Sequence, residues 1–404
     1  MIVCACLALM PALMRPVVLL ESNPPSVVTR AWQEAEKAAQ TAAQDPKIEA
    51  KHKADLDSDT KVGKKYTEEV EKEFKLSKNE EYVARVQRIG GILAEIARTH
   101  QVACTWGDKR LNPFDYSFKV VEDKDINAFS LPGGYIYVYE GLLKFVESDD
   151  ELASVLAHEI SHASFRHVAT LQREQSKLQA ITLPLILIGI FVGGEAGPNL
   201  GTLSSLIGQA KGSGWSVSAE EAADYGGFQY MMQSKFNPVA MLTFMERLAK
   251  EQRFTDRIDL GIFQTHPPTR ERADRLIQHL TERGIPIRRS LASPSYAVQM
   301  KPSDSGSIDL WFDGRKLTSF GGDEARPRAE EAAVKLNAFF DSVPDLFDVQ
   351  VRDNVILGRR QPLFQVTASD SALNKQTPKE MSAHSVDSIR RSLYLLAYRV
   401  WDAR

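Results

Sequence analysis

Between residues 149 and 167, apolar positions recur three and four residues apart, as they do on one face of a helix. These positions are Leu152, Val155, Leu156, Ile160 and Ala163. Just upstream, Ser148 and Glu151 have the spacing of a capping box, so we expect the helix to begin near Asp149. We expect it to continue without interruption as far as His167.

Other parts of the chain also show helical and strand periods. The pattern predicts a strand over 135–138 after a Pro-Gly-Gly turn and a helix that starts near Thr269. After a stretch rich in Pro, Ser and Arg, we expect strands and helices over 307–320, 325–340, 347–356, 363–367 and 378–400, of which the second and last are helices. The predicted fold class is α+β: a mostly helical core with a small edge β-sheet, followed by a small C-terminal α/β domain.

The first residues form an apolar leader, in which Arg15 is the charged exception. An export signal is the favoured interpretation, because Pro11 and Pro16 interrupt the alternative, a membrane anchor. This leader predicts an extracytoplasmic protein, periplasmic or membrane-associated. The expected parts of the chain are a signal peptide or anchor at 1–22, a lead-in linker or helix at 23–59, a core domain at 60–285, a linker at 286–306 and an accessory domain at 307–404.

A second apolar stretch lies between Ile181 and Val192 and is too short to cross a membrane. Two interpretations stay open for it: a buried helical hairpin, or a lid or patch that contacts a membrane surface beside the cleft. The whole chain of 404 residues is 43% hydrophobic and 25% charged, which suits a multi-part soluble protein. No basic patch with interleaved aromatic residues is present, so a nucleic-acid partner is not expected.

The predicted helix over residues 149–167 carries the motif His158-Glu159-Ile160-Ser161-His162. At about 100° per residue, both histidines project from one helix face, where they can bind a single metal ion. Glu159 lies beside them and can reach a water bound to that metal. The pattern is typical of zinc hydrolases, and the alternative is a chance occurrence on an amphipathic helix.

A third ligand is expected from Glu220, in the acidic helical segment at residues 218–224. Glu220 and Asp224 are four positions apart and share a helix face. Glu220 can therefore bind the metal while Asp224 accepts a hydrogen bond from a ligand imidazole. Two imidazoles and a carboxylate suit zinc, so one zinc ion per chain is the expected cofactor. The alternative for such an acidic cluster is a solvated surface.

His167 follows the motif, but the glycine turn of the metzincin pattern is missing. On an uninterrupted helix, the side chain of His167 points about 140° away from that of His162. We therefore expect His167 to be a structural residue or a support of the metal site, and not a ligand.

Residues 57–280 resemble gluzincin metallopeptidases of the family that contains CAAX prenyl endopeptidases, the heat-shock protease HtpX and periplasmic outer-membrane quality-control proteases. The matching segments are residues 127–138, 141–143, 150–167 and 220–224, and a helix pair over 63–97 and the segment 265–272 are also similar to the family. The resemblance implies a zincin-like core in which His158, His162 and Glu220 bind zinc and Glu159 is the general base. It also implies that an edge strand near Asn127 and Phe129 aligns an extended peptide, for which the alternative is a core hairpin.

His266 precedes two prolines, and two interpretations stay open for it. The residue occupies a turn that leads into the helix at Thr269, or it approaches the cleft and gates the metal or stabilises the tetrahedral intermediate. Arg272 is expected to anchor that helix by an ion pair.

Together these observations predict a zinc-dependent endopeptidase that acts on protein or peptide substrates in envelope quality control, with Glu159 as general base on a zinc-bound water. One alternative is a protease-like binding or chaperone protein with a closed or regulated zinc site. Another is a zinc hydrolase of a non-peptide amide. No tetratricopeptide period is visible, so the partner contacts of the outer-membrane-assembly branch are not expected.

Overall fold

The helical and strand periods of the sequence correspond to packed helices and small three-stranded sheets. The computed structural model describes residues 46–176, 215–254, 266–267, 269–303, 306–394 and 396. Residues 1–55 and residues 56–404 form separate units. The described part of the first unit, residues 46–55, is the largely exposed beginning of a helix.

The first group of elements runs from residue 46 to residue 282. Its helices are α2 (Pro46–Glu73), α3 (Glu80–Thr99), α4 (Glu140–Phe145), α5 (Asp149–Ser164), α6 (His167–Ser176), α9 (Trp215–Met232), α10 (Val239–Phe254) and α12 (Arg270–Glu282). Its strands are β1 (Ser117–Val121), β2 (Ala128–Leu131) and β3 (Tyr135–Tyr139). The helix starts expected near Asp149 and Thr269 are confirmed, and the side chains of Ser148 and Thr269 cap them. The capping box is only half formed, because the Glu151 carboxylate accepts from the N–H of Glu147.

The three strands form one sheet in the order β1-β3-β2, with β1 parallel and β2 antiparallel to β3. Gly133 and Gly134 turn the chain between β2 and β3 with φ values of 81° and 90°, a conformation that favours glycine. A Cβ on Gly133 would lie 2.6 Å from Cα of Thr60, so this turn lies directly against α2. The strand expected over residues 135–138 is confirmed as β3.

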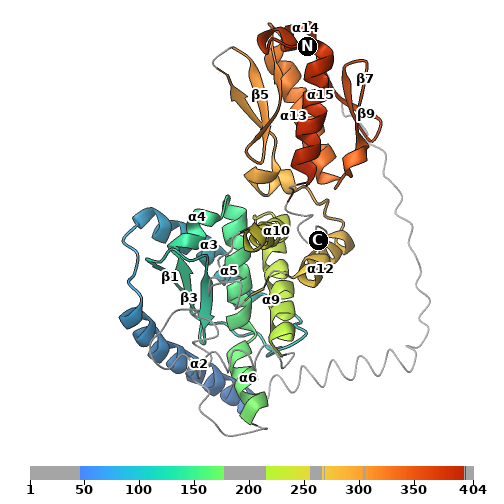
Figure 1. Ribbon diagram of the computed structural model, residues 1–404. Coiled ribbons are helices and arrows are strands. Elements are labelled where there is room, and N and C mark those ends of the chain that lie inside the picture. Colours follow the sequence, from blue (N-terminus) through green and yellow to red (C-terminus); the bar gives the residue numbers. More distant parts are fainter. Residues whose placement is uncertain are drawn as a thin grey trace, which may run out of the picture. The chain divides into compact units, whose positions relative to one another are not determined.

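Helix α5 is central to this group (Figure 1), in contact with α3 and β2 and also with α9 and α10. All of its side chains from Glu151 to Ser164 are buried. Close packing on every side holds the groups that α5 carries in fixed positions. Gly226 allows α9 to approach α5 closely, because a Cβ there would lie 2.5 Å from the Phe165 ring.

Helix α5 ends at Ser164 and α6 begins at His167, so the prediction of an uninterrupted helix through His167 is wrong. Arg166 adopts a left-handed φ of 52° at the corner. Its guanidinium is held by the buried carboxylates of Asp59 and Asp108, at 2.6 Å and 2.9 Å. These tertiary ion pairs stabilise a backbone conformation that a residue with a side chain adopts rarely.

The second group of elements follows residue 298. Its strands are β4 (Gln299–Pro302), β5 (Ile308–Phe312), β6 (Arg315–Phe320), β7 (Val349–Arg352), β8 (Val355–Gly358) and β9 (Gln361–Gln365), and its helices are α13 (Ala325–Asp341), α14 (Ala368–Leu373) and α15 (Pro378–Tyr394). The sheets β4-β5-β6 and β7-β8-β9 are both antiparallel. Helices α13 and α15 contact strands of both sheets and share a core with them. The fold is therefore α+β, as expected.

Two strands expected in this region are hairpins. The expected strand at 307–320 turns at Asp313 and Gly314, and the one at 347–356 turns at Asp353 and Asn354, all with positive φ. Asp-Gly is a strong signal for a two-residue hairpin turn. The prediction of a single long strand did not take this signal into account. Helix α14 has no counterpart among the predicted elements.

The segment expected as a linker, residues 286–306, contains short 3-10 turns at Arg289–Leu291 and Pro294–Tyr296 as well as β4. Arg289 forms an ion pair with Glu246 of α10 at 2.7 Å, and the Tyr296 hydroxyl donates to the same carboxylate at 2.7 Å. All three side chains are buried. This part of the chain is therefore fastened to α10 by polar contacts.

Some expectations lie outside the described residues. They are the leader at 1–22, the lead-in as far as residue 45, and the apolar stretch between Ile181 and Val192. None of the helices that the structure describes combines the length and the apolarity needed to cross a membrane.

Candidate metal centre

His158 and His162 lie one turn apart on α5, and their rings point to the same place. Their Nε2 atoms are 3.1 Å apart, and both side chains are buried. Glu220 approaches them from α9, with its carboxylate oxygens 3.4 Å from Nε2 of His158 and 3.3 Å from Nε2 of His162. The three residues expected as metal ligands are thus brought together by the packing of α5 against α9.

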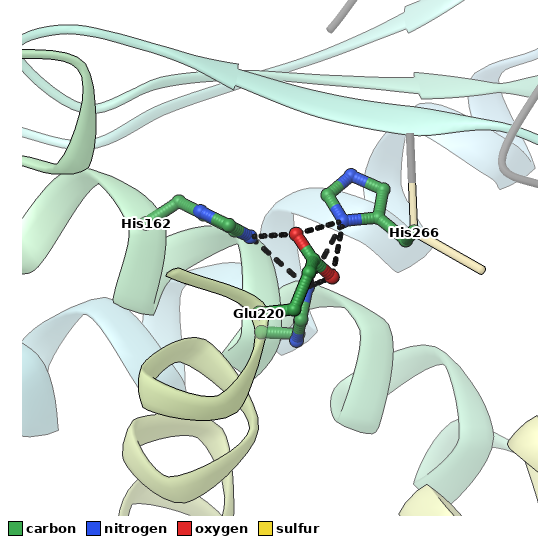
Figure 2. Close-up of side chains that lie close together, drawn as sticks. His162, Glu220 and His266 are labelled. Carbon is green, nitrogen blue, oxygen red and sulfur yellow. Dashed lines mark hydrogen bonds and ion pairs between the residues drawn. The ribbon is translucent and has the colours of Figure 1, made fainter. Parts of the chain in front are cut away.

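His266 brings a fourth donor to the same place (Figure 2). Its Nδ1 lies 2.9 Å from Oε2 of Glu220 and 3.2 Å from Nε2 of His158. One ligand atom from each of the four residues lies within 4.8 Å of the others. His266 therefore sits at the metal centre itself, although it also precedes the start of α12.

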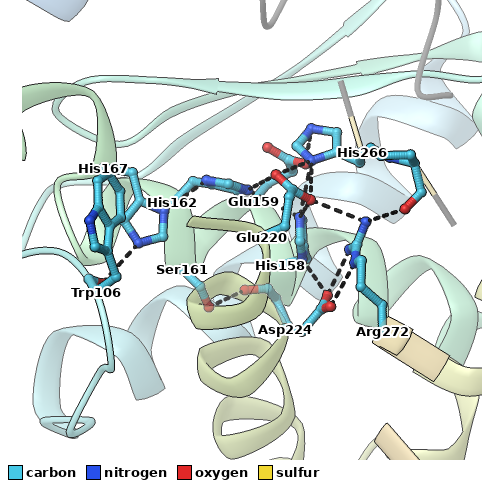
Figure 3. A network of polar contacts seen from close by, with 12 residues as sticks. Trp106, His158, Glu159, Ser161, His162, His167, Glu220, Asp224, His266 and Arg272 are labelled. Carbon is cyan, nitrogen blue, oxygen red and sulfur yellow. Dashed lines mark hydrogen bonds and ion pairs between the residues drawn. The ribbon is translucent and has the colours of Figure 1, made fainter. Parts of the chain in front are cut away.

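Asp224 and Arg272 support the cluster from one side (Figure 3). Oδ1 of Asp224 lies 3.0 Å from Nδ1 of His158, on the opposite edge of the ring from the cluster. The Arg272 guanidinium donates to both Asp224 oxygens, at 2.7 Å and 2.8 Å. It also lies 3.2 Å from Glu220. Arg272 thus joins the start of α12 to the carboxylates of α9 by ion pairs.

The buried charges shift the pKa values of these groups. Burial alone would lower the pKa of His158, but the carboxylates of Asp224 and Glu220 raise it to about 10. Burial alone would raise the pKa of Glu220, yet His266 and Arg272 hold this pKa well below its usual range. Burial would also raise the pKa of Asp224, but Arg272 and His158 lower it to about 2. Both carboxylates are therefore ionised at neutral pH, as cation binding requires.

Glu159 lies beside the cluster and is 1% exposed. Its Oε2 has no hydrogen-bond partner among the described residues, and its Oε1 is 3.5 Å from Nε2 of His266. A buried carboxylate oxygen without a partner is costly, so it indicates a group that interacts with something else at the site. Two imidazoles, one carboxylate and this orphaned oxygen fit a zinc ion and the water that it binds.

A pocket opens beside His158 and Glu159. One side is apolar and is formed mainly by α10; its residues are Val155, Met241, Phe244, Met245 and Leu248. No sequence pattern marks these residues as part of a site, because their apolar spacing is equally typical of a helix that faces the core.

Asn127 and Phe129 are both fully buried. The Phe129 ring stacks on Tyr137 with the ring centroids 5.1 Å apart, and Asn127 Oδ1 accepts from the N–H of Ala128 at 2.9 Å. Phe129 is a core residue of the sheet, in agreement with the hairpin alternative for its side chain.

His167 also lies close to the cluster without belonging to it. Its Nδ1 is 2.9 Å from Nδ1 of His162, on the edge of that ring that faces away from Glu220. Burial, followed by the neighbouring His162, lowers the pKa of His167 well below its usual range. The expectation that His167 is not a ligand agrees with this geometry. The expected reason, that a continuous helix points His167 away from His162, is wrong.

Comparison with known proteins identifies the region that carries this site. Residues 93–280 match the model of peptidase family M48. A beta-barrel assembly-enhancing protease of Yersinia pestis is 31% identical over 52% of this chain and 40% of its own length. The protein of that name from Escherichia coli K12 is 32% identical over 38% of this chain and 32% of its own length. The metalloprotease LoiP of Escherichia coli K12 is 27% identical over 51% of this chain and 74% of its own length.

The chain thus spans less than half the length of the beta-barrel assembly-enhancing proteases that it matches. The region matched by the family model nevertheless contains every residue of the cluster, from His158 to His266, and both supporting residues, Asp224 and Arg272. The match confirms the resemblance seen in the sequence. Residues 93–280 of this chain are therefore similar to peptidase family M48.

Proposed function

We propose that this chain is a zinc-dependent endopeptidase that hydrolyses peptide bonds in protein substrates. The observation that carries the proposal is the combination of three ligand side chains with the unpartnered Glu159 oxygen beside them. A metal site that only stabilised the fold would need the ligands but would not need this additional buried carboxylate.

The residues divide the chemistry between them. Zinc, when bound by His158, His162 and Glu220, would lower the pKa of a coordinated water and polarise the scissile carbonyl. Glu159 takes a proton from the attacking water and gives it to the amine nitrogen of the leaving fragment as the C–N bond breaks. Asp224 holds the His158 ring in the orientation that turns Nε2 to the cluster.

We place the substrate backbone along the outer edge of β2, where no described strand pairs. The N–H of Tyr139 donates to the carbonyl of Asn127 at 3.0 Å, so Asn127 and Phe129 use their backbone groups to pair with β3. The outward backbone groups are those of Ala128 and Ser130. An extended peptide would therefore bond to these two residues, and at Ala128 it would replace the Asn127 Oδ1 atom as acceptor of the N–H.

His266 supports a second candidate function, a binding or chaperone-like protein whose zinc site is closed. In this arrangement its Nδ1 lies among the ligand atoms, at the position that a substrate carbonyl or water would need. We propose that His266 gates an endopeptidase, and that its displacement opens the site.

Replacement of His266 with alanine distinguishes these two functions. If His266 is a gate, the His266→Ala variant will cleave an unfolded protein several-fold faster than wild type, measured by appearance of fragments over time. The control is His279→Ala, a histidine of α12 that stacks on Phe228 and lies outside the cluster. An unchanged or lower rate for His266→Ala relative to this control contradicts the gate.

The place of action is proposed from the relatives and from the leader. Two of the relatives are named for β-barrel assembly, and the apolar leader predicts export, so we propose that the substrates are proteins of the cell envelope. Contact of residues 181–192 with a membrane surface belongs to the same proposal.

The function is tested by incubating the purified chain with an unfolded protein in the presence of zinc. We expect cleavage that stops when a chelator is added and returns when zinc is restored. No cleavage by wild type or by His266→Ala under any of these conditions would favour the binding function.

A further inference from the structure

The corner between α5 and α6 places a second histidine behind a metal ligand. Because the helix breaks at Phe165 and Arg166, His167 lies beside His162 rather than on the far side of the helix (Figure 3). On a continuous helix these two rings, five residues apart, would point in directions about 140° apart. The broken helix instead brings their Nδ1 atoms to 2.9 Å.

The hydrogen bonds of these two rings fix where their protons are. Nε2 of His167 lies 3.3 Å from the carbonyl oxygen of Trp106, which can only accept, so this nitrogen carries a hydrogen. Nδ1 of a neutral His167 then has a free electron pair directed at His162. The hydrogen between the two Nδ1 atoms therefore belongs to His162, and the electron pair of His162 is on Nε2, the atom that faces Glu220.

We propose that His167 is a positioning residue that selects the metal-binding tautomer of His162 through a relay from the Trp106 carbonyl. The inference rests on the proposed zinc site. His167 does not touch the metal; it acts through His162 by accepting the hydrogen of Nδ1 and fixing the plane of the ring.

The surroundings of His167 allow its ring one orientation. The ring is 2% exposed and packs between Trp106 and Phe165, whose ring centroids lie 5.1 Å and 5.7 Å away. Gly107, with a φ of 109°, brings the backbone against the ring, since a Cβ there would lie 2.9 Å from the His167 Cδ2 atom. The acceptor on His167 is therefore held in place before any metal binds.

The two ligand histidines are supported by partners of different charge. His158 has the ionised Asp224 behind it, whereas His162 has an imidazole. A carboxylate behind both rings would add a further negative charge to a centre that already holds Glu159, Glu220 and Asp224. A neutral acceptor orients the His162 ring without that charge.

The test compares His167→Asn with His167→Leu, two side chains of nearly equal shape, of which only asparagine has an oxygen that can accept near the Nδ1 position. Zinc affinity is measured by competition with a chelating indicator, and the coordination geometry by the visible spectrum of the cobalt-substituted protein. We expect His167→Leu to lose about 10- to 100-fold in zinc affinity and to alter the cobalt spectrum. We expect His167→Asn to stay close to wild type in both.

The melting temperature of each metal-free variant separates positioning from packing, because both substitutions leave a similar cavity. Equal zinc affinity for the two variants, whether both are unchanged or both are weakened, would overturn the relay. If neither variant folds, the His167→Phe variant takes their place, because phenylalanine fills the volume of the ring without an acceptor. This variant must then lose about 10- to 100-fold in zinc affinity. Failure of the wild type to bind zinc would overturn the proposed function as well. Failure of the relay alone would leave the wild type able to bind zinc, so the two outcomes are distinguishable.

Discussion

At the residue scale, the proposed metal centre depends on buried charges that are balanced against one another. Glu220 and Asp224 lie one turn apart on α9, and Arg272 contacts both, at 3.2 Å and 2.7 Å. Each of these three side chains is at most 10% exposed, so none of them relies on solvent for its stabilisation. Removal of one partner leaves the others buried and uncompensated.

The Asp224→Ala variant tests this balance. We expect its free energy of unfolding to fall by about 3 to 5 kcal/mol, because the Arg272 charge stays buried, and its zinc affinity to fall by about 10- to 100-fold, because the His158 ring loses its acceptor. Denaturant unfolding of the metal-free protein and chelator competition measure the two effects.

The matched control for Asp224 is Glu221, a carboxylate of the same helix that pairs with the half-exposed Arg275. Replacement of Glu221 with alanine should change the free energy of unfolding by about 1 kcal/mol or less and leave zinc affinity unchanged. Similar results for the two variants would show that Asp224 does not support the metal centre.

Local spacing explains why His158 and His162 were expected side by side, because they lie one helical turn apart. Glu220 shares a helix face with Asp224, but its approach to the two histidines depends on the packing of α9 against α5. The position of His266 could not be predicted, because it is 108 residues from His158 and its approach depends on tertiary packing. Arg272 was expected to form an ion pair, but its partner Asp224 is 48 residues away and no local pattern names it.

At the scale of elements, the centre depends on the close approach of α9 to α5. Gly226 lies at this contact, where an added Cβ would meet the Phe165 ring at 2.5 Å and Ser161 Oγ at 2.7 Å. The Phe165 ring also begins the corner that leads to His167. A wider spacing between the helices would therefore move Glu220 away from the two histidines.

The Gly226→Ala variant is expected to lower the free energy of unfolding by about 1 to 3 kcal/mol and to weaken zinc binding, since the added methyl group forces the helices apart. The control is Gly91→Ala in α3, where an added Cβ meets nothing within 4 Å. There the better helix propensity of alanine should raise the free energy of unfolding by about 0.5 to 1 kcal/mol. Stabilisation by both substitutions would contradict tight packing between α5 and α9.

Elements with a clear local period could be predicted, as α13 and β3 show. The break between α5 and α6 could not, because Arg166 is held by Asp59 and Asp108, which lie 107 and 58 residues away in the chain. A glycine at that position would have indicated a turn, but an arginine does not. The hairpin at Asp313 and Gly314 did carry its own signal, a two-residue turn sequence within the predicted strand.

At the scale of the whole molecule, the proposed ligands lie on separate elements of residues 56–404: two on α5 and one on α9, with His266 as a further donor just before α12. A metal bound by His158, His162 and Glu220 favours the folded state, because the unfolded chain has no such site. With free zinc at about 100 times its dissociation constant, we expect the folded state to gain about 2.7 kcal/mol. Calorimetry should show a higher melting temperature with zinc than with a chelator. The His158→Ala control should show no shift in melting temperature. Equal melting temperatures of the wild type with zinc and with a chelator would contradict a shared metal site.

The central claim is that Glu159 acts on a water at a metal held by His158, His162 and Glu220. The most direct test measures both the zinc content and the cleavage of an unfolded protein for the Glu159→Gln variant. This variant keeps the shape of the side chain and every ligand but has no base. We predict one zinc ion per chain, as in the wild type, and no cleavage above background. Zinc-dependent cleavage at the wild-type rate by Glu159→Gln would contradict the mechanism.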